Sequence, residues 1–214
     1  MIKYSLFFLS ILLLSSCGIQ HNVPLTAKPN KSIPPNTIIA FVDQNGDFYP
    51  NDWSKVYGKP PRNGKRNAYS LSKLAEEKAL VKDLAAFETA YINKLAQSVK
   101  DKRRVIVLVH GYNANARETT ATYERIQAKM NISRSDEVIQ FYWDGLYTKN
   151  PFSGMKTWFN ASEYSQFAGK FALRKILNSM QDKDIYLISH SRGASVVLSA
   201  LSTFAIDSTE LKNS

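Results

Sequence analysis

The chain has 214 residues, a size that suits one domain with a buried core. Its 28 Lys and Arg residues outnumber its 18 Asp and Glu residues, and the resulting net charge of +10 favours anionic neighbours such as lipid headgroups or envelope glycans. The sequence lacks the interleaved aromatic and basic module of an RNA or DNA binder, which argues against nucleic acid as a partner. Cys17 is the only cysteine, so an intramolecular disulfide is excluded.

The N-terminus has the pattern of an export signal. Lys3 precedes an apolar run over residues 6–14 that is too short to span a bilayer comfortably. The following Leu14-Ser15-Ser16-Cys17 resembles a bacterial lipobox, which implies cleavage after residue 16, lipidation of Cys17 and, with Gly18 next, sorting to the outer membrane. The alternative is an ordinary signal peptide cut near Ser16, with Cys17 incidental.

Three segments follow from this pattern: a lipoprotein signal peptide over residues 1–16, a tether over 17–36 and one domain over 37–214. The tether is polar and contains four prolines, so we expect a flexible spacer. Residues 38–42 predict a strand, and Asn45-Gly46 predicts the turn of an N-terminal β-hairpin that returns through residues 48–49. Apolar residues at three- and four-residue spacing over 70–99 predict one long helix or two abutting ones.

Asp43, Asn45 and Asp47 have the alternate spacing of a calcium loop. The position that requires glycine is Phe48, however, and the twelfth position, which requires glutamate, is Ser54. The turn is therefore the better interpretation, and we expect neither a metal nor a cofactor.

The second half of the chain alternates strands and helices. Residues 105–109, 138–143 and 185–188 are continuous apolar runs of the kind that form strands buried in a parallel sheet. Helical patterns over 116–130 and 162–180 lie between them, and Asn115 with Glu118 predicts the capped start of the first helix. The fold class is therefore α/β, with a doubly wound, mainly parallel sheet.

The most specific motif is Ser189-His190-Ser191-Arg192-Gly193, directly after the last of these runs. A serine hydroxyl is a weak nucleophile, and a tight strand-to-helix turn with small flanking residues can present it beside backbone N–H groups. We therefore interpret Ser191 as the nucleophile of such an elbow. The alternative is a structural serine that caps the following helix.

A second motif, His110-Gly111-Tyr112-Asn113, follows the run over 105–109. With both motifs in this order, the chain resembles the α/β-hydrolase superfamily over about residues 100–204, and most of all its uncharacterised bacterial esterase- and lipase-like members. The resemblance implies that Ser191 is the nucleophile and that the N–H groups of Tyr112 and Arg192 are the oxyanion donors. It gives His110, Gly111, Ser189 and Gly193 structural roles, with Ser189 replacing the commoner glycine of the elbow.

The base of the catalytic triad is missing from this pattern. The superfamily order is Ser, then Asp or Glu, then His, whereas His21 lies in the tether, His110 starts the oxyanion loop and His190 lies inside the elbow. Asp144 and Asp207 are both misplaced for the acid, and Asp144 is expected to cap a turn.

The elbow strand would also lack a partner on its outer side, so residues 185–188 would form an exposed apolar edge of a sheet that is incomplete on its C-terminal side. Two explanations remain open. The chain is an N-terminal fragment of a longer protein, or it is a natural short form that has lost catalysis or borrows its edge from a partner.

The function that this sequence favours is a lipid-anchored outer-membrane serine hydrolase that cleaves an ester or related acyl bond and is inactive as the chain stands. The alternative is a non-catalytic binding or scaffold lipoprotein of the envelope, and an acyltransferase cannot be separated from a hydrolase. Aromatic residues over 143–159, including Tyr147, Phe152 and Trp158, form either a pocket wall or a loop packed on the core.

Overall fold

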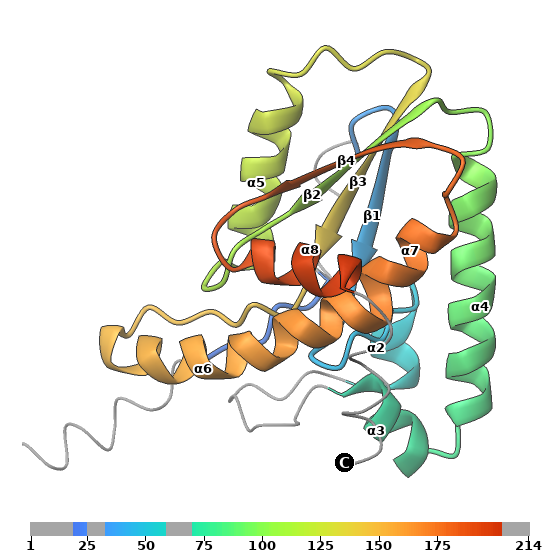
Figure 1. The fold of residues 1–214 in the computed structure, drawn as a ribbon. Helices are drawn as coiled ribbons and strands as arrows, with labels where there is room; N and C mark the ends of the chain where they lie inside the picture. Colours follow the sequence, from blue (N-terminus) through green and yellow to red (C-terminus); the bar gives the residue numbers. More distant parts are fainter. Residues whose placement is uncertain (1–18, 25–32, 59–69, 203–214) are drawn as a thin grey trace, which may run out of the picture.

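The computed structural model describes residues 19–24, 33–58 and 70–202. The elements follow one another as β1 (Thr37–Phe41), α2 (Trp53–Val56), α3 (Leu71–Glu77), α4 (Val81–Ser98), β2 (Arg104–Val109), α5 (Ala116–Gln127), β3 (Asp136–Tyr142), α6 (Pro151–Phe167), the π-helical segment η1 (Ala168–Leu173), α7 (Arg174–Asn178), β4 (Asp184–Ser189) and α8 (Gly193–Leu201) (Figure 1).

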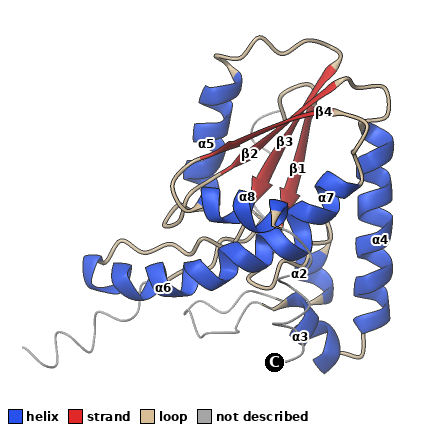
Figure 2. Ribbon diagram, viewed as in Figure 1, coloured by secondary structure: helices blue, strands red, loops and turns tan. Residues whose placement is uncertain are grey.

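The four strands form one parallel sheet in the order β1-β3-β2-β4 (Figure 2). β3 is buried along its whole length and β2 along nearly all of it, which explains why their sequences are mainly apolar rather than alternating. The polar Asp136, Glu137 and Gln140 of β3 are buried as well. The carboxyl ends of all four strands meet at one edge, where the loops after β2, β3 and β4 lie next to one another. This edge is where open parallel sheets bind ligands.

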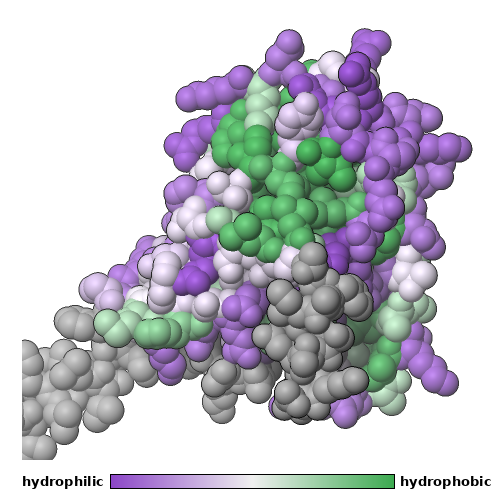
Figure 3. All heavy atoms as spheres, viewed as in Figure 1, coloured by the Kyte–Doolittle hydropathy of each residue, from purple (hydrophilic) through white to green (hydrophobic). Residues whose placement is uncertain are grey.

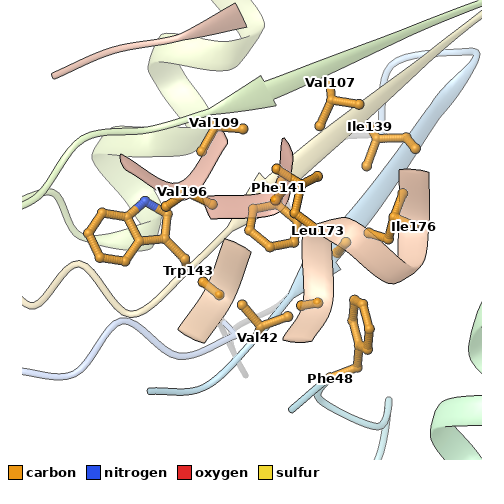
Figure 4. Packing of buried hydrophobic residues seen from close by; sticks show 14 of the residues in the cluster. Val42, Phe48, Val107, Val109, Ile139, Phe141, Trp143, Leu173, Ile176 and Val196 are labelled. Carbon is orange, nitrogen blue, oxygen red and sulfur yellow. The ribbon is translucent and has the colours of Figure 1, made fainter. Parts of the chain in front are cut away.

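Helices cover both faces of the sheet, as the doubly wound prediction requires. On one face, Tyr123 of α5 packs with Ile106 and Leu108 of β2 and donates its hydroxyl to the Phe141 carbonyl oxygen at 2.7 Å. On the other face, the helices from α6 to α8, together with the end of α4, cover the main core. Figure 4 shows the sheet and helix residues that meet there, including Val107, Ile139, Phe141, Leu173, Ile176 and Val196.

β4 is an edge strand of the described sheet. Tyr186 and Ile188 on this strand are exposed, and Leu198 and Leu201 on α8 are exposed as well. Figure 3 shows the broad apolar surface over β4 and α8. The sequence prediction of an apolar edge at residues 185–188 is confirmed, because β4 pairs only with β2 among the described strands.

The predicted hairpin turn at Asn45-Gly46 is confirmed, but β1 pairs in parallel with β3 rather than along the returning segment. Only Val42 and Phe48 form an antiparallel bridge before the chain turns away to α2. Asp43 closes this turn: its Oδ1 accepts the N–H groups of Asn45 and Asp47 at 2.8 and 2.9 Å, and its Oδ2 accepts the N–H of Leu71 at 2.5 Å. The Asp43 carboxylate therefore accepts hydrogen bonds from three backbone N–H groups, as the turn interpretation requires.

The long helical pattern over residues 70–99 forms two helices, α3 and α4, which is the second of the two predicted forms. The break falls at Ala79, whose φ of 56° is incompatible with a continuous helix. The Asn115 cap of α5 is confirmed, since its Oδ1 accepts the Glu118 N–H at 2.9 Å. α6 begins at Pro151 rather than at residue 162, and a proline suits the first turn of a helix, where its missing N–H is not needed.

Residues 19–24 differ from the flexible tether predicted for them, because they pack against the domain. Ile19 is 8% exposed and belongs to the main core. Gln20 forms an antiparallel bridge with Tyr147, with N···O distances of 2.7 and 2.8 Å. Cys17 and the predicted signal peptide lie outside the described residues. In the described part of the chain, every helix is too short or too polar to cross a bilayer.

Candidate active site

Ser191 lies on a strained turn between β4 and α8. Its φ of 52° is in the left-handed region, which a residue with a side chain rarely adopts. Hydrogen bonds on both sides hold this conformation: the His190 N–H donates to the Val109 carbonyl oxygen at 3.1 Å, and the Gly193 N–H donates to the His190 carbonyl oxygen at 2.9 Å. This is the backbone geometry of a nucleophile elbow, and strain of this kind is typical of functional sites.

Two glycines allow the turn to approach its neighbours closely. A Cβ at Gly193 would lie 2.6 Å from the His110 carbonyl oxygen and 2.7 Å from that of Val109, so only glycine fits beside the end of β2. A Cβ at Gly111 would lie 3.2 Å from the Cβ of Ser191. The loop after β2 and the elbow after β4 are therefore in direct contact, as the two sequence motifs predict.

The two predicted oxyanion donors lie in these two loops. Among the described residues, the backbone N–H groups of Tyr112 and Arg192 make no hydrogen bond to the protein. Arg192 directly precedes α8, so its N–H also lies at the positive end of a helix dipole. An N–H that the protein leaves unused beside a serine is what an oxyanion hole requires.

Trp158 of α6 joins the two donor-bearing residues. The Arg192 guanidinium lies over its ring, with Cζ 3.6 Å from the ring centre. The Tyr112 ring meets the same indole edge-on, at a centroid distance of 4.9 Å and an angle of 83°. Arg192 also donates from Nη1 to the Ser162 hydroxyl, again on α6, at 3.1 Å. Trp158, one of the residues predicted to form either a pocket wall or a packed loop, thus lies on a helix and contacts both residues with the proposed donors.

His110 is buried between the loops after β2 and β3, and both of its ring nitrogens form hydrogen bonds. Its Nδ1–H donates to the Gly111 carbonyl oxygen at 2.7 Å, and its Nε2 accepts the Trp143 N–H at 3.1 Å. Burial lowers the pKa of His110 to about 4, so the ring is neutral near pH 7. These two hydrogen bonds join the loop after β2 to the residue that follows β3.

His21 and Asp144 form a buried pair that the sequence did not predict. His21 Nδ1 donates to Asp144 Oδ2, and the two side chains are 3% and 1% exposed. The other carboxylate oxygen of Asp144 accepts the Asn22 N–H at 2.9 Å and the Leu146 N–H at 3.4 Å. The turn role predicted for Asp144 is therefore only part of what it does, because its carboxylate also fixes residues 19–24 to the loop after β3.

The site as described contains a nucleophile candidate and donors but no base in contact with the serine. Among the described residues, the Ser191 hydroxyl makes no hydrogen bond. His190 is exposed within the elbow, and Asp207 lies outside the described residues. The described residues also include no cluster of three His, Cys, Asp or Glu side chains that could hold a metal ion.

Sequence reasoning missed the contacts of Trp158, His21 and Asn22. Trp158 was named for its aromatic character, but no local pattern indicates that it touches two loops from other strands. The segment with His21 and Asn22 is short, polar and followed by proline, which is the composition of a linker. Asp144, two residues after the end of β3, was expected only to cap a turn, and no local signal indicated its buried partner.

A parallel sheet whose carboxyl edge presents a serine on a strained strand-to-helix turn is the architecture of the α/β hydrolases, and this protein has that fold. The chain belongs to the family described as alpha/beta hydrolase of unknown function (DUF900), whose sequence pattern matches residues 85–213. This match begins within α4, earlier than the resemblance seen from residue 100, and it includes both site loops. No curated protein and no solved structure matches the chain.

Proposed function

We propose that this hydrolase cleaves a carboxylic ester or a related acyl bond through an acyl intermediate on Ser191. The observation that carries the proposal is the strained φ of Ser191 beside two N–H groups, those of Tyr112 and Arg192, that are not used by the protein. A strained turn that presents an unbonded hydroxyl has a cost in stability, and a catalytic role explains why it is kept.

In the proposed reaction, the Ser191 oxygen attacks the substrate carbonyl carbon while its proton passes to a general base. The negative charge on the tetrahedral intermediate is stabilised by hydrogen bonds from the N–H groups of Tyr112 and Arg192. The intermediate collapses when the base returns the proton to the leaving alcohol. Water then attacks the acyl-serine by the same route in reverse, which releases the acid and restores the hydroxyl.

The test is labelling with a fluorophosphonate probe, which reacts with activated serines. It is run on the 214-residue chain and on the product of the complete open reading frame, each with a Ser191→Ala control. Labelling that Ser191→Ala abolishes supports the hydrolase. Labelling of a longer product alone would place the base outside these residues, since loss of a triad member lowers the rate by several orders of magnitude.

A second function is favoured by one specific observation, namely that no described histidine forms a hydrogen bond with the Ser191 hydroxyl. This second function is that of a non-catalytic binding or scaffold lipoprotein with the same fold. It would fold and bind its envelope partner, but neither product would react with the probe. The two functions therefore give opposite results in the same experiment.

For localisation, we propose a bacterial lipoprotein that is anchored through Cys17, with the outer membrane as its destination. The support is the Leu14-Ser15-Ser16-Cys17 pattern behind the apolar run and the net charge of +10, which suits an anionic surface. Metabolic labelling with a radioactive fatty acid should mark the protein, and Cys17→Ala should remove the label. Labelling that survives Cys17→Ala would contradict the anchor.

A further inference from the structure

α6 exposes an apolar ridge at its N-terminal half. Met155, Trp158 and Phe159 have the three- and four-residue spacing that places side chains on one face of a helix. They are 73%, 42% and 68% exposed, respectively, although large apolar side chains are normally buried. Figure 3 shows this strip of apolar surface over α6, separate from the larger area over β4 and α8. We call these three residues the α6 ridge.

Two lysines flank the N-terminal part of the α6 ridge. Lys149 and Lys156 are exposed, and the sequence contains no Asp or Glu between residues 145 and 162. The acid that follows the ridge on the same helix is Glu163, four residues after Phe159. An exposed apolar strip flanked by lysines is the pattern of a helix that lies in the interface of an anionic membrane.

The N-terminal segment reaches the same edge of the molecule. Gln20 pairs with Tyr147, four residues before α6 begins, and Ile19 is buried in the core. Cys17 precedes Ile19 by two residues in the sequence. A lipid on Cys17 would therefore hold the start of α6 close to the membrane, with no long spacer between them.

The α6 ridge also borders the candidate active site. Trp158, its middle member, contacts both Tyr112 and Arg192, the residues whose N–H groups lie beside Ser191. Figure 1 shows α6 running past the carboxyl ends of the strands, with α8 above it. A surface that covered the ridge would thus face the mouth of the site rather than the opposite end of the sheet.

We propose that the α6 ridge inserts into the headgroup region of an anionic phospholipid membrane and holds the mouth of the Ser191 site against that membrane. Apolar contact by Met155 and Phe159 and attraction of Lys149 and Lys156 to anionic headgroups act together with the lipid anchor. The orientation does not depend on the chemistry of Ser191, so it stands or falls separately from the proposed hydrolase.

The test uses the full chain, produced with its leader in a bacterial host and reconstituted into vesicles of phosphatidylcholine with and without phosphatidylglycerol. An environment-sensitive fluorophore is attached to Phe159→Cys, and the matched control carries it at Ala121→Cys, an exposed position on α5 at the other face of the sheet. We expect the fluorophore at residue 159 to show a blue shift and to be quenched by nitroxide-labelled lipids, more strongly with phosphatidylglycerol. The fluorophore at residue 121 should show neither effect.

The charge reversals Lys149→Glu and Lys156→Glu, combined with Met155→Ser, should abolish the quenching at residue 159 while the anchored protein still floats with the vesicles. The proposal is overturned if the fluorophore at residue 159 resembles that at residue 121 in floated protein, or if the protein does not float at all. A blue shift without quenching by nitroxide lipids would mean that protein rather than lipid covers the ridge, and this also overturns the proposal.

Discussion

Replacing Trp158 with alanine would remove the ring that lies between the two residues with the proposed oxyanion donors. The Arg192 guanidinium is 3.6 Å from the centre of this ring, and the Tyr112 ring meets it edge-on at 4.9 Å. Neither N–H belongs to Trp158, so the substitution removes neither donor but releases the side chains that orient their loops. We expect a loss of reactivity at Ser191 with the fold intact.

The size of the effect follows from these two contacts. A cation–π contact at an exposed site contributes about 1 kcal/mol, and an edge-to-face aromatic pair contributes about the same beyond its buried area. Together they give about 2 kcal/mol, which corresponds to roughly a 30-fold change in an equilibrium or a rate. Deleting an oxyanion donor outright costs about 100- to 1000-fold, so a loosened pair of donors should lie below that range.

The assay is the second-order rate of fluorophosphonate labelling of Ser191, measured on whichever product reacts, with the free energy of unfolding from urea titration as a check. Trp158→Phe keeps an aromatic face and should lose much less rate than Trp158→Ala. Phe159→Ala, next to it on α6 and 68% exposed, should leave labelling of a water-soluble probe unchanged. If Trp158→Ala labels as fast as Phe159→Ala, the proposed role of the indole is refuted.

Three further predictions concern the supports of the site. Gly193→Ala places a Cβ 2.6 Å from the His110 carbonyl oxygen and should lower the free energy of unfolding by about 3 kcal/mol, whereas an unchanged urea midpoint would contradict the close approach. The pKa of His110 is about 4 in the folded state and 6.5 in the unfolded state, so the unfolded state binds more protons between these two pH values. The free energy of unfolding should therefore fall by about 3 kcal/mol as the pH drops from 6.5 to 4. His110→Gln should remove this part of the pH dependence, and a stability difference from wild type that stays constant with pH would exclude His110 as its source. Asp144→Asn breaks the buried pair with His21 and should speed hydrogen exchange at the Gln20 and Asn22 amides. Exchange in β2 is the internal control. Unchanged exchange at both amides would mean that the pair does not hold residues 19–24 against the domain.

Much of the fold could be predicted because its signals are local. The runs that became β2, β3 and β4 are mainly apolar, which indicates strands of one sheet, and the helices between them imply parallel pairing. Burial on both faces holds for β2 and β3, whereas β4 is mostly exposed at the edge. The elbow could be predicted for the same reason, since a strand, a small-residue turn and a helix are adjacent in sequence. In contrast, β1 was assigned to a hairpin because Asn45-Gly46 is a strong turn signal, and nothing near it reports pairing with a strand about 100 residues away.

The sequence by itself determined the elements that depend on neighbouring residues: the strand runs, the Asn115 cap of α5 and the serine turn with its glycine. Only the tertiary structure decided that Trp158 packs on both donor-bearing loops and that Asp144 holds His21 and the segment that carries it. Local patterns are set by backbone geometry and burial over a few residues. The contacts that complete this site join residues as much as 123 positions apart, and such contacts leave no periodic signature in the chain.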